Sequence, residues 1–150
     1  MKRRAITLIE IMIVIFIIGL IGSVIGYNLK WSLNEGKAFK SEHGSKQVYD
    51  FLNLQISQKK DAFDEVLEDP ETALENTGFV NRPGKLLKDG WNQKFVIEKI
   101  EAVDGKGADF VVYSQNWYNF LKTKKKMSDS MMQEEYPWAF YFDKEDEKET

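Results

Sequence analysis

The pattern of apolar and polar positions divides the chain near residue 27. Three basic residues, Lys2, Arg3 and Arg4, precede an apolar run over residues 5–26 in which Glu10 is the only ionisable side chain. Roughly 20 helical residues, each rising about 1.5 Å, cross a hydrocarbon core of about 30 Å. We therefore predict a transmembrane helix over residues 6–27, with the basic N-terminus on the cytoplasmic side as the positive-inside rule requires.

Glu10 is the unusual residue of the apolar run. A carboxylate in an apolar helix costs about 2.5–3.5 kcal/mol at the centre of a bilayer and less near its edge, unless it is paired or protonated. We therefore expect a partner that compensates Glu10.

The same helix is predicted to continue as an amphipathic helix over residues 28–60. Apolar residues recur there at roughly helical spacing among Lys, Glu, Gln and Ser. Such a pattern is typical of a helix with one face on a globular domain. The expected buried stripe consists of Val48, Phe51, Leu52 and Gln55.

Residues 61–142 are predicted to form a small α+β domain, followed by a charged, disordered tail over residues 143–150. The first part of this domain, residues 61–83, is expected to be a connection that contains a short helix. Asp69 is expected to cap this helix, Pro70 to begin it and Gly78 to end it. The Pro83-Gly84 pair is expected to break the chain before the β region.

The β region is predicted from runs of β-branched and aromatic residues. Residues 95–97 and 110–113 are expected to form an antiparallel hairpin on the long helix, with its turn at residues 104–107. The aromatic residues 136–142 are expected to form a terminal strand, at an edge because of Pro137.

Composition limits the possible chemistry. The formal net charge is −3 although the N-terminus is basic, which argues against a nucleic-acid binder. The absence of cysteine excludes disulfides and thiolate sites.

The only histidine, His43, has Ser41, Ser45 and Asp50 nearby. On one helix these side chains cannot converge as a hydrolytic triad, so we predict no enzymatic activity.

The N-terminal order of residues resembles the prepilin signal of type IV pilins and type II secretion pseudopilins. A basic leader and the small residue Ala5 precede Ile6-Thr7-Leu8-Ile9-Glu10, where that family usually has Gly and then Phe-Thr-Leu-Ile-Glu. The resemblance implies that residues 1–5 are a leader peptide, that a prepilin peptidase cuts between Ala5 and Ile6, and that Ile6 becomes N-methylated. It also implies that Glu10 meets the N-terminal ammonium of a neighbouring subunit in a filament, so that each charge compensates the other.

A second segment resembles the major, G-type pseudopilin of type II secretion. Residues 86–95 read LLKDGWNQKF, and Lys88, Asp89 and Trp91 match that family's Leu-x-Lys-Asp-Pro-Trp-Gly-Asn-Pro-Tyr segment. Gly90 stands where that family has Pro. Asp89 and Gly90 favour a turn, and Trp91 is a large apolar anchor at the entrance to a strand.

The calcium site of the G-type family is not expected here. After Ser114 the chain continues as Gln-Asn-Trp-Tyr-Asn-Phe and then Lys122 to Lys126, which lacks the carboxylates that a hard cation requires. We therefore predict no cofactor, and we interpret the lysines as a solvated loop facing acidic neighbours rather than a site for nucleic acid or lipid headgroups. The existence of an unrelated metal site is left open by four acidic residues: Asp104, Asp109, Asp129 and Glu134.

The prediction as a whole is an α+β, pilin-like fold, whose long N-terminal helix packs its second half on a small antiparallel sheet. The resemblance implies a structural pseudopilin of a type II secretion system, anchored in the inner membrane with its globular domain in the periplasm and assembled into a short filament. The implied partners are its own copies, other pseudopilins, the prepilin peptidase, the inner-membrane platform with its ATPase, and the membrane. A type IV pilin or minor pseudopilin is an alternative, and so is a membrane-anchored binding protein that never polymerises.

Overall fold

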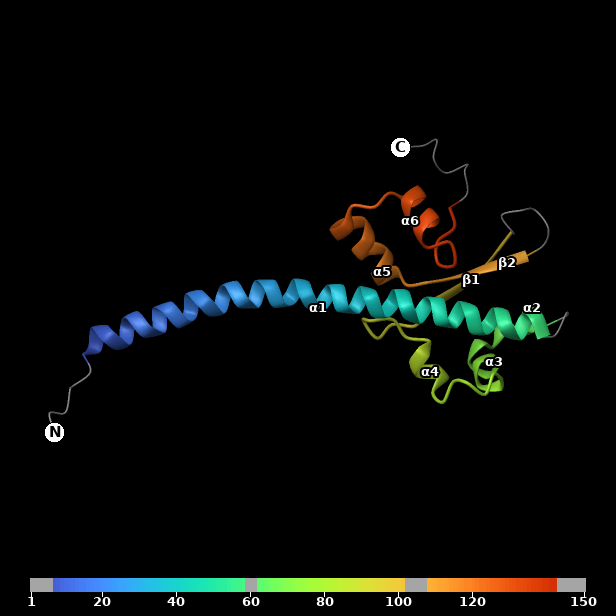
Figure 1. The fold of residues 1–150 in the computed structure, drawn as a ribbon, viewed down its shortest axis with the longest axis horizontal. Coiled ribbons are helices and arrows are strands. Elements are labelled where there is room, and N and C mark those ends of the chain that lie inside the picture. Colours follow the sequence, from blue (N-terminus) through green and yellow to red (C-terminus); the bar gives the residue numbers. More distant parts are fainter. Residues whose placement is uncertain (1–6, 59–61, 102–107, 143–150) are drawn as a thin grey trace. The chain divides into compact units, whose positions relative to one another are not determined.

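A computed structural model describes residues 7–58, 62–101 and 108–142 and shows an α+β protein (Figure 1). The chain divides into two compact units, Met1–Gly36 and Lys37–Thr150, and the first helix runs through both. The elements in chain order are α1 (Leu8–Gln58), α2 (Phe63–Glu68), α3 (Pro70–Asn76), α4 (Pro83–Leu86), β1 (Val96–Glu101), β2 (Ala108–Tyr113), α5 (Gln115–Phe120), η1 (Leu121–Lys125) and α6 (Asp129–Glu135).

The first unit contains the apolar part of α1. Its large apolar side chains are exposed, from 43% at Trp31 to 81% at Leu8, and an 18-residue window of the helix has a mean hydropathy of 2.9 with none of it buried in the protein. Exposing so much apolar area to water is unfavourable, so this helix has the length and composition of a membrane span. The predicted apolar helix is confirmed, and its crossing of a membrane stays a prediction.

In the second unit, α1 buries the predicted stripe. Val48 and Leu52 have no exposed surface, Gln55 is buried and Phe51 is half-buried. Around them lies a core formed with side chains of α2, α3 and the hairpin, among them Val66, Leu74, Phe95, Phe110 and Val112. The predicted buried stripe of this helix is therefore confirmed.

The predicted antiparallel hairpin is also confirmed. β1 pairs with β2 from Val96 opposite Tyr113 to Glu101 opposite Ala108, and the two strands form the sheet of the described chain. The predicted turn at residues 104–107 lies outside the described residues.

The segment before the hairpin is more helical than predicted. Asp69 caps α3, its Oδ1 accepting a hydrogen bond from the Thr72 N–H at 3.1 Å, and Gly78 follows with φ +70°, as expected. However, the connection also contains α2. Pro83 does not break the chain but begins α4, because proline lacks only an N–H that the first turn leaves unpaired anyway.

The predicted aromatic strand over residues 136–142 is wrong. α6 ends just before Tyr136, and the Ala139 and Phe140 N–H groups donate back to the Tyr136 carbonyl at 2.9 and 3.0 Å. Because these donors are used within a turn, they cannot form a ladder. The Val112 N–H donates to the Trp138 carbonyl at 2.9 Å, which attaches the turn to β2.

The lysine-rich segment is helical rather than the predicted loop. α5 continues into η1, a π-helix that ends at Lys126 in a left-handed conformation with φ +55°. The apolar sides of α5 and η1 pack in a second core cluster together with α6 and the turn at residues 136–140. Its buried members are Ala38, Trp117, Phe120, Leu121, Met132, Tyr136, Ala139 and Phe140.

Three tyrosines of the second unit make the stability of the protein sensitive to alkaline pH. Burial, a hydrogen bond to Glu135 and the charges of Glu42 and Glu135 raise the pKa of the Tyr136 hydroxyl, and burial also raises the pKa of Tyr49 and Tyr113. Above the unfolded tyrosine pKa of about 10, the folded protein therefore retains protons that the unfolded chain loses.

We expect the free energy of unfolding to be unaffected by these groups below pH about 10 and to fall as the pH rises beyond it. Tyr136→Phe should reduce the slope of this fall, since phenylalanine does not ionise. Denaturant titrations of both proteins at neutral and alkaline pH measure the two slopes. Equal slopes would show that Tyr136 ionises alike in the folded and unfolded states.

Candidate functional site

Glu10 forms hydrogen bonds with Thr7 at the start of its own helix, α1. The Glu10 carboxylate accepts hydrogen bonds from the N–H and hydroxyl of Thr7 at 3.1 and 3.3 Å, and the Glu10 N–H donates to the Thr7 hydroxyl at 3.3 Å. This reciprocal arrangement is a capping box, which satisfies two N–H groups that a helix start leaves unpaired. Its Thr-x-x-Glu signature is visible in the sequence, yet the sequence analysis did not use it.

The other residues predicted for processing lie outside the described residues. These are Lys2, Arg3 and Arg4 of the leader and the two residues that flank the predicted cut, Ala5 and Ile6. Their roles stay predictions.

Asp89 is the polar centre of the second unit. Its side chain has no exposed surface, and Oδ1 accepts hydrogen bonds from the N–H groups of Trp91 and Gln93, both at 2.8 Å. Oδ2 accepts from the Ser114 hydroxyl at 2.5 Å and from the Asn116 side-chain amide at 3.1 Å. Asp89 therefore shapes its own turn and fastens that turn to the start of α5.

The same turn is attached to α1. Gly90 donates its N–H to the Ser41 hydroxyl at 2.9 Å, which in turn donates to the Lys37 carbonyl at 2.9 Å. The Lys40 ammonium donates to the Asp89 carbonyl at 3.1 Å. Helix, turn and α5 are thus joined by polar contacts around one carboxylate.

Trp91 extends this attachment into the apolar core. Its half-buried ring packs against the second core cluster, with its centroid 6.3 Å from that of Phe120. The structure therefore places Asp89 and Trp91 at the turn where the sequence predicted them. The partners Ser41, Ser114 and Asn116 were missed, because single polar residues far apart in sequence carry no pattern.

The structure does not assemble the candidate hydrolytic residues. The His43 Nδ1 atom lies 3.3 Å from the Phe39 carbonyl, and the two rings lie 4.1 Å apart. The hydroxyls of Ser41 and Ser45 donate to backbone carbonyls of α1, and Asp50 pairs with a lysine. None of these contacts joins a serine, the histidine and an acid.

The acidic residues considered for a metal are likewise apart. Asp109 accepts a hydrogen bond from the adjacent Phe110 N–H, and Asp129 pairs with Lys122. Within residues 7–58, 62–101 and 108–142, no three His, Cys, Asp or Glu side chains gather closely enough to hold an ion. Asp104 lies outside those ranges.

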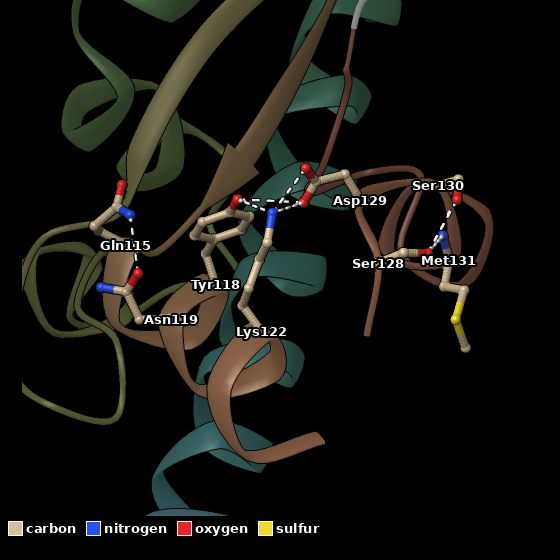
Figure 2. A network of polar contacts seen from close by, with 8 residues as sticks. All are labelled: Gln115, Tyr118, Asn119, Lys122, Ser128, Asp129, Ser130 and Met131. Carbon is tan, nitrogen blue, oxygen red and sulfur yellow. Dashed lines mark hydrogen bonds and ion pairs between the residues drawn. The ribbon is translucent and has the colours of Figure 1, made fainter. Parts of the chain in front are cut away.

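Lys122 forms a network between η1 and α6. Figure 2 shows its ammonium between the Tyr118 hydroxyl, at 3.0 Å, and the two oxygens of Asp129, at 2.8 and 2.9 Å. The Tyr118 hydroxyl also donates to Asp129 at 3.2 Å. The hydrogen bond to Asp129 is the main cause that raises the Lys122 pKa. Ser128 caps α6 beside the network, accepting from the Met131 N–H at 3.3 Å.

No family model and no solved structure matches the chain. Three proteins of Chlamydia are similar to it, each named "Putative outer membrane protein". The relative from Chlamydia pneumoniae is 33% identical over 114 residues, which cover 76% of this chain and 89% of the relative. The relatives from Chlamydia trachomatis serovar D and Chlamydia muridarum are both 34% identical, covering 79% and 76% of this chain and 92% and 89% of their own lengths. The chain belongs to the family of these chlamydial proteins.

The names of these relatives differ from the location predicted for this chain. They refer to an outer membrane, whereas the basic leader and the apolar helix predicted an inner-membrane anchor. The described part of α1 has the length and composition of a membrane span, and the inner-membrane anchor with its topology stays a prediction.

Proposed function

We propose that the protein is a pseudopilin, a structural subunit that is cut between Ala5 and Ile6, remains anchored in the inner membrane by α1 and assembles through Glu10 into a short periplasmic filament. The observation that carries this proposal is the start of α1. A single carboxylate, that of Glu10, stands in the first turn of α1, and the large apolar side chains that follow it in the first unit are exposed.

The exposed helix supports assembly because it needs cover along its whole apolar length. Lipid can supply this cover, and so can the same helices of neighbouring copies. Cleavage after Ala5 would place a new ammonium on Ile6, one residue before Thr7 and four residues before Glu10. An ammonium and a carboxylate that are each costly in lipid compensate one another when neighbouring helices bring them together.

The second unit supports a structural role. Its buried polar side chains hold elements together, as Asp89 does, and the candidate hydrolytic residues are separated. The proposed partners are copies of this chain, other pseudopilins, the prepilin peptidase and the inner-membrane secretion platform.

A second candidate function has a specific observation in its favour. Because Thr7 already satisfies Glu10 within one helix, the carboxylate does not need a neighbouring subunit. The protein would then be a membrane-anchored binding protein that does not polymerise.

The test of processing is the intact mass and N-terminal sequence of the protein purified from its native membrane, with and without the peptidase. We expect a mature chain that begins at N-methylated Ile6 and that is lost when the peptidase is absent. A chain that begins at Met1 in both cases would overturn the proposal.

The test of assembly uses a matched pair of variants. Glu10→Ala removes the carboxylate and keeps the bond from its own N–H to the Thr7 hydroxyl, whereas Thr7→Ala removes that hydroxyl and keeps the carboxylate. The absence of native cysteine allows single cysteines introduced along α1 to report disulfide cross-links between copies. We expect Glu10→Ala to abolish the cross-links and Thr7→Ala to retain them. Equal effects of the two changes would assign Glu10 to the cap alone.

A further inference from the structure

Opposite charges are separated along the second unit. Residues 61–81 hold seven acidic residues and no basic one, whereas residues 115–126 hold four lysines and no acidic one. The first segment forms α2 and α3, and the second forms α5 and η1.

These two segments lie at different ends of the part of α1 that belongs to this unit. Val66 and Leu74 of the acidic segment belong to the core cluster of Leu52, and Leu121 of the basic segment belongs to the cluster of Ala38. On a helix, positions 38 and 52 are separated by about 21 Å. The lysines are therefore at the end of the unit at which the chain enters from the apolar helix.

η1 directs its lysines into solvent. Its buried residue is Leu121, while the side chains that follow are exposed, and the left-handed Lys126 ends the helix. Lys122 pairs with Asp129 and thereby fixes the segment to α6. Lys124 and Lys126 project beyond this pair and are exposed.

Two lysines of α1 add to this charge. Lys37 and Lys40 are exposed, and both contact the turn at residues 89–90, whose Trp91 ring packs near Phe120. We call the five residues the lysine surface: Lys37, Lys40, Lys122, Lys124 and Lys126. The acidic side chains on the elements around this surface are Glu35 and Glu42 on α1 and Asp129, Glu134 and Glu135 on α6, and of these Asp129 pairs with Lys122.

In contrast to the interpretation of the lysines as a solvated loop, we propose that the lysine surface docks on anionic phospholipid headgroups beside the membrane anchor. Lys37 follows the end of the apolar run, Gly26, by eleven residues. These eleven residues belong to α1 and measure about 16 Å as a helix, so Lys37 follows the end of the apolar run by about 16 Å along the helix. Each lysine at an anionic surface should raise the docked-to-undocked ratio by roughly fivefold.

A membrane fits this surface better than the acidic end of another copy. The anchor tethers the lysine surface to the bilayer at high effective concentration, whereas a second copy has to be recruited. The charge separation also favours one orientation, with the acidic α2 and α3 turned away from anionic lipid. The proposal needs α1 to be anchored in a bilayer, but it needs neither cleavage nor polymerisation.

The test uses the full chain in nanodiscs with one copy per disc. A single cysteine introduced at Thr123, an exposed residue of η1, carries a fluorophore, and a lipid in the disc carries the acceptor. We expect stronger energy transfer in an equal mixture of phosphatidylcholine and phosphatidylglycerol than in phosphatidylcholine alone, and loss of the difference at high salt. A label at Asn76 in α3 should show no such gain.

Matched variants test whether the gain in energy transfer depends on the lysine surface or on the overall charge of the protein. Lys124→Glu with Lys126→Glu should abolish the gain, and Lys124→Gln with Lys126→Gln should reduce it. Lys85→Glu with Lys94→Glu changes two exposed lysines outside the surface by the same charge and should keep it. Equal transfer in both bilayers, or a gain that the reversal at 124 and 126 leaves intact, would overturn the proposal.

Two further outcomes distinguish this proposal from related ones. A gain that appears only with several copies per disc and disappears with Glu65→Lys and Glu68→Lys would assign the lysines to a second copy and overturn membrane docking. An unprocessed chain that still shows the gain would leave docking standing while the proposed function falls.

Discussion

Asp89→Ala is expected to destabilise the second unit by about 3–5 kcal/mol, since it removes the acceptor of several buried donors at once. Four donors lose their partner: the N–H groups of Trp91 and Gln93, the Ser114 hydroxyl and the Asn116 amide. Asp89 has no exposed surface, so water cannot replace the carboxylate without opening the turn. Denaturant unfolding of the full chain in detergent, followed by tryptophan fluorescence, measures the change.

Asp64→Ala is the matched control for this prediction. Asp64 pairs with Lys99 at 2.7 Å, but its side chain is 76% exposed. Exposed pairs contribute at most about 1 kcal/mol, so this substitution should change stability little. Asp89→Asn keeps the size of the side chain and one acceptor, and should fall between the two. If Asp89→Ala were no more destabilising than Asp64→Ala, the turn would not depend on its carboxylate.

Gly90→Ala should destabilise the same unit by about 3 kcal/mol, because a side chain has no room at this position. A Cβ atom there would lie 2.0 Å from the Lys37 carbonyl oxygen and 2.6 Å from its Cα atom. Both are backbone atoms of α1, so the helix or the turn would have to move. Any movement also stretches the hydrogen bonds from Gly90 to Ser41 and from Lys40 to Asp89.

Gly84→Ala provides the control for Gly90. A Cβ atom at Gly84 would meet only the end of the Glu71 side chain, at 2.7 Å, which can rotate away. We therefore expect a small change in stability for Gly84→Ala, and a lower denaturation midpoint with an unchanged slope for Gly90→Ala. Similar midpoints for the two variants would mean that the approach of the turn to α1 adapts to a side chain.

Asp89 and Gly90 also define how far the predicted resemblance to the G-type segment extends. Lys88, Asp89 and Trp91 match the G-type segment, but Gly90 replaces its proline. Proline at this position would lack the N–H that binds Ser41 and would add ring atoms against Lys37. The attachment of the turn to α1 therefore follows from this chain's own residues.

The sequence by itself determined the elements whose signal is local. The apolar run and the stripe of Val48 and Leu52 predicted α1, because burial on one face of a helix repeats with the helical period. Asp69 and Pro70 marked the start of α3, and the β-branched runs located β1 and β2. Each of these signals arises from neighbouring residues, so the chain carries it without its tertiary contacts.

Only the tertiary structure decided which polar residues meet. Ser114 and Asn116 are 25 and 27 positions from Asp89, and Gly90 is 49 from Ser41. No periodicity marks such pairs, since packing of separate elements brings them together. The aromatic residues 136–142 show the same limit in reverse: their β propensity predicted a strand, but the hydrogen bonds to the Tyr136 carbonyl and packing against Trp117 stabilise a turn instead.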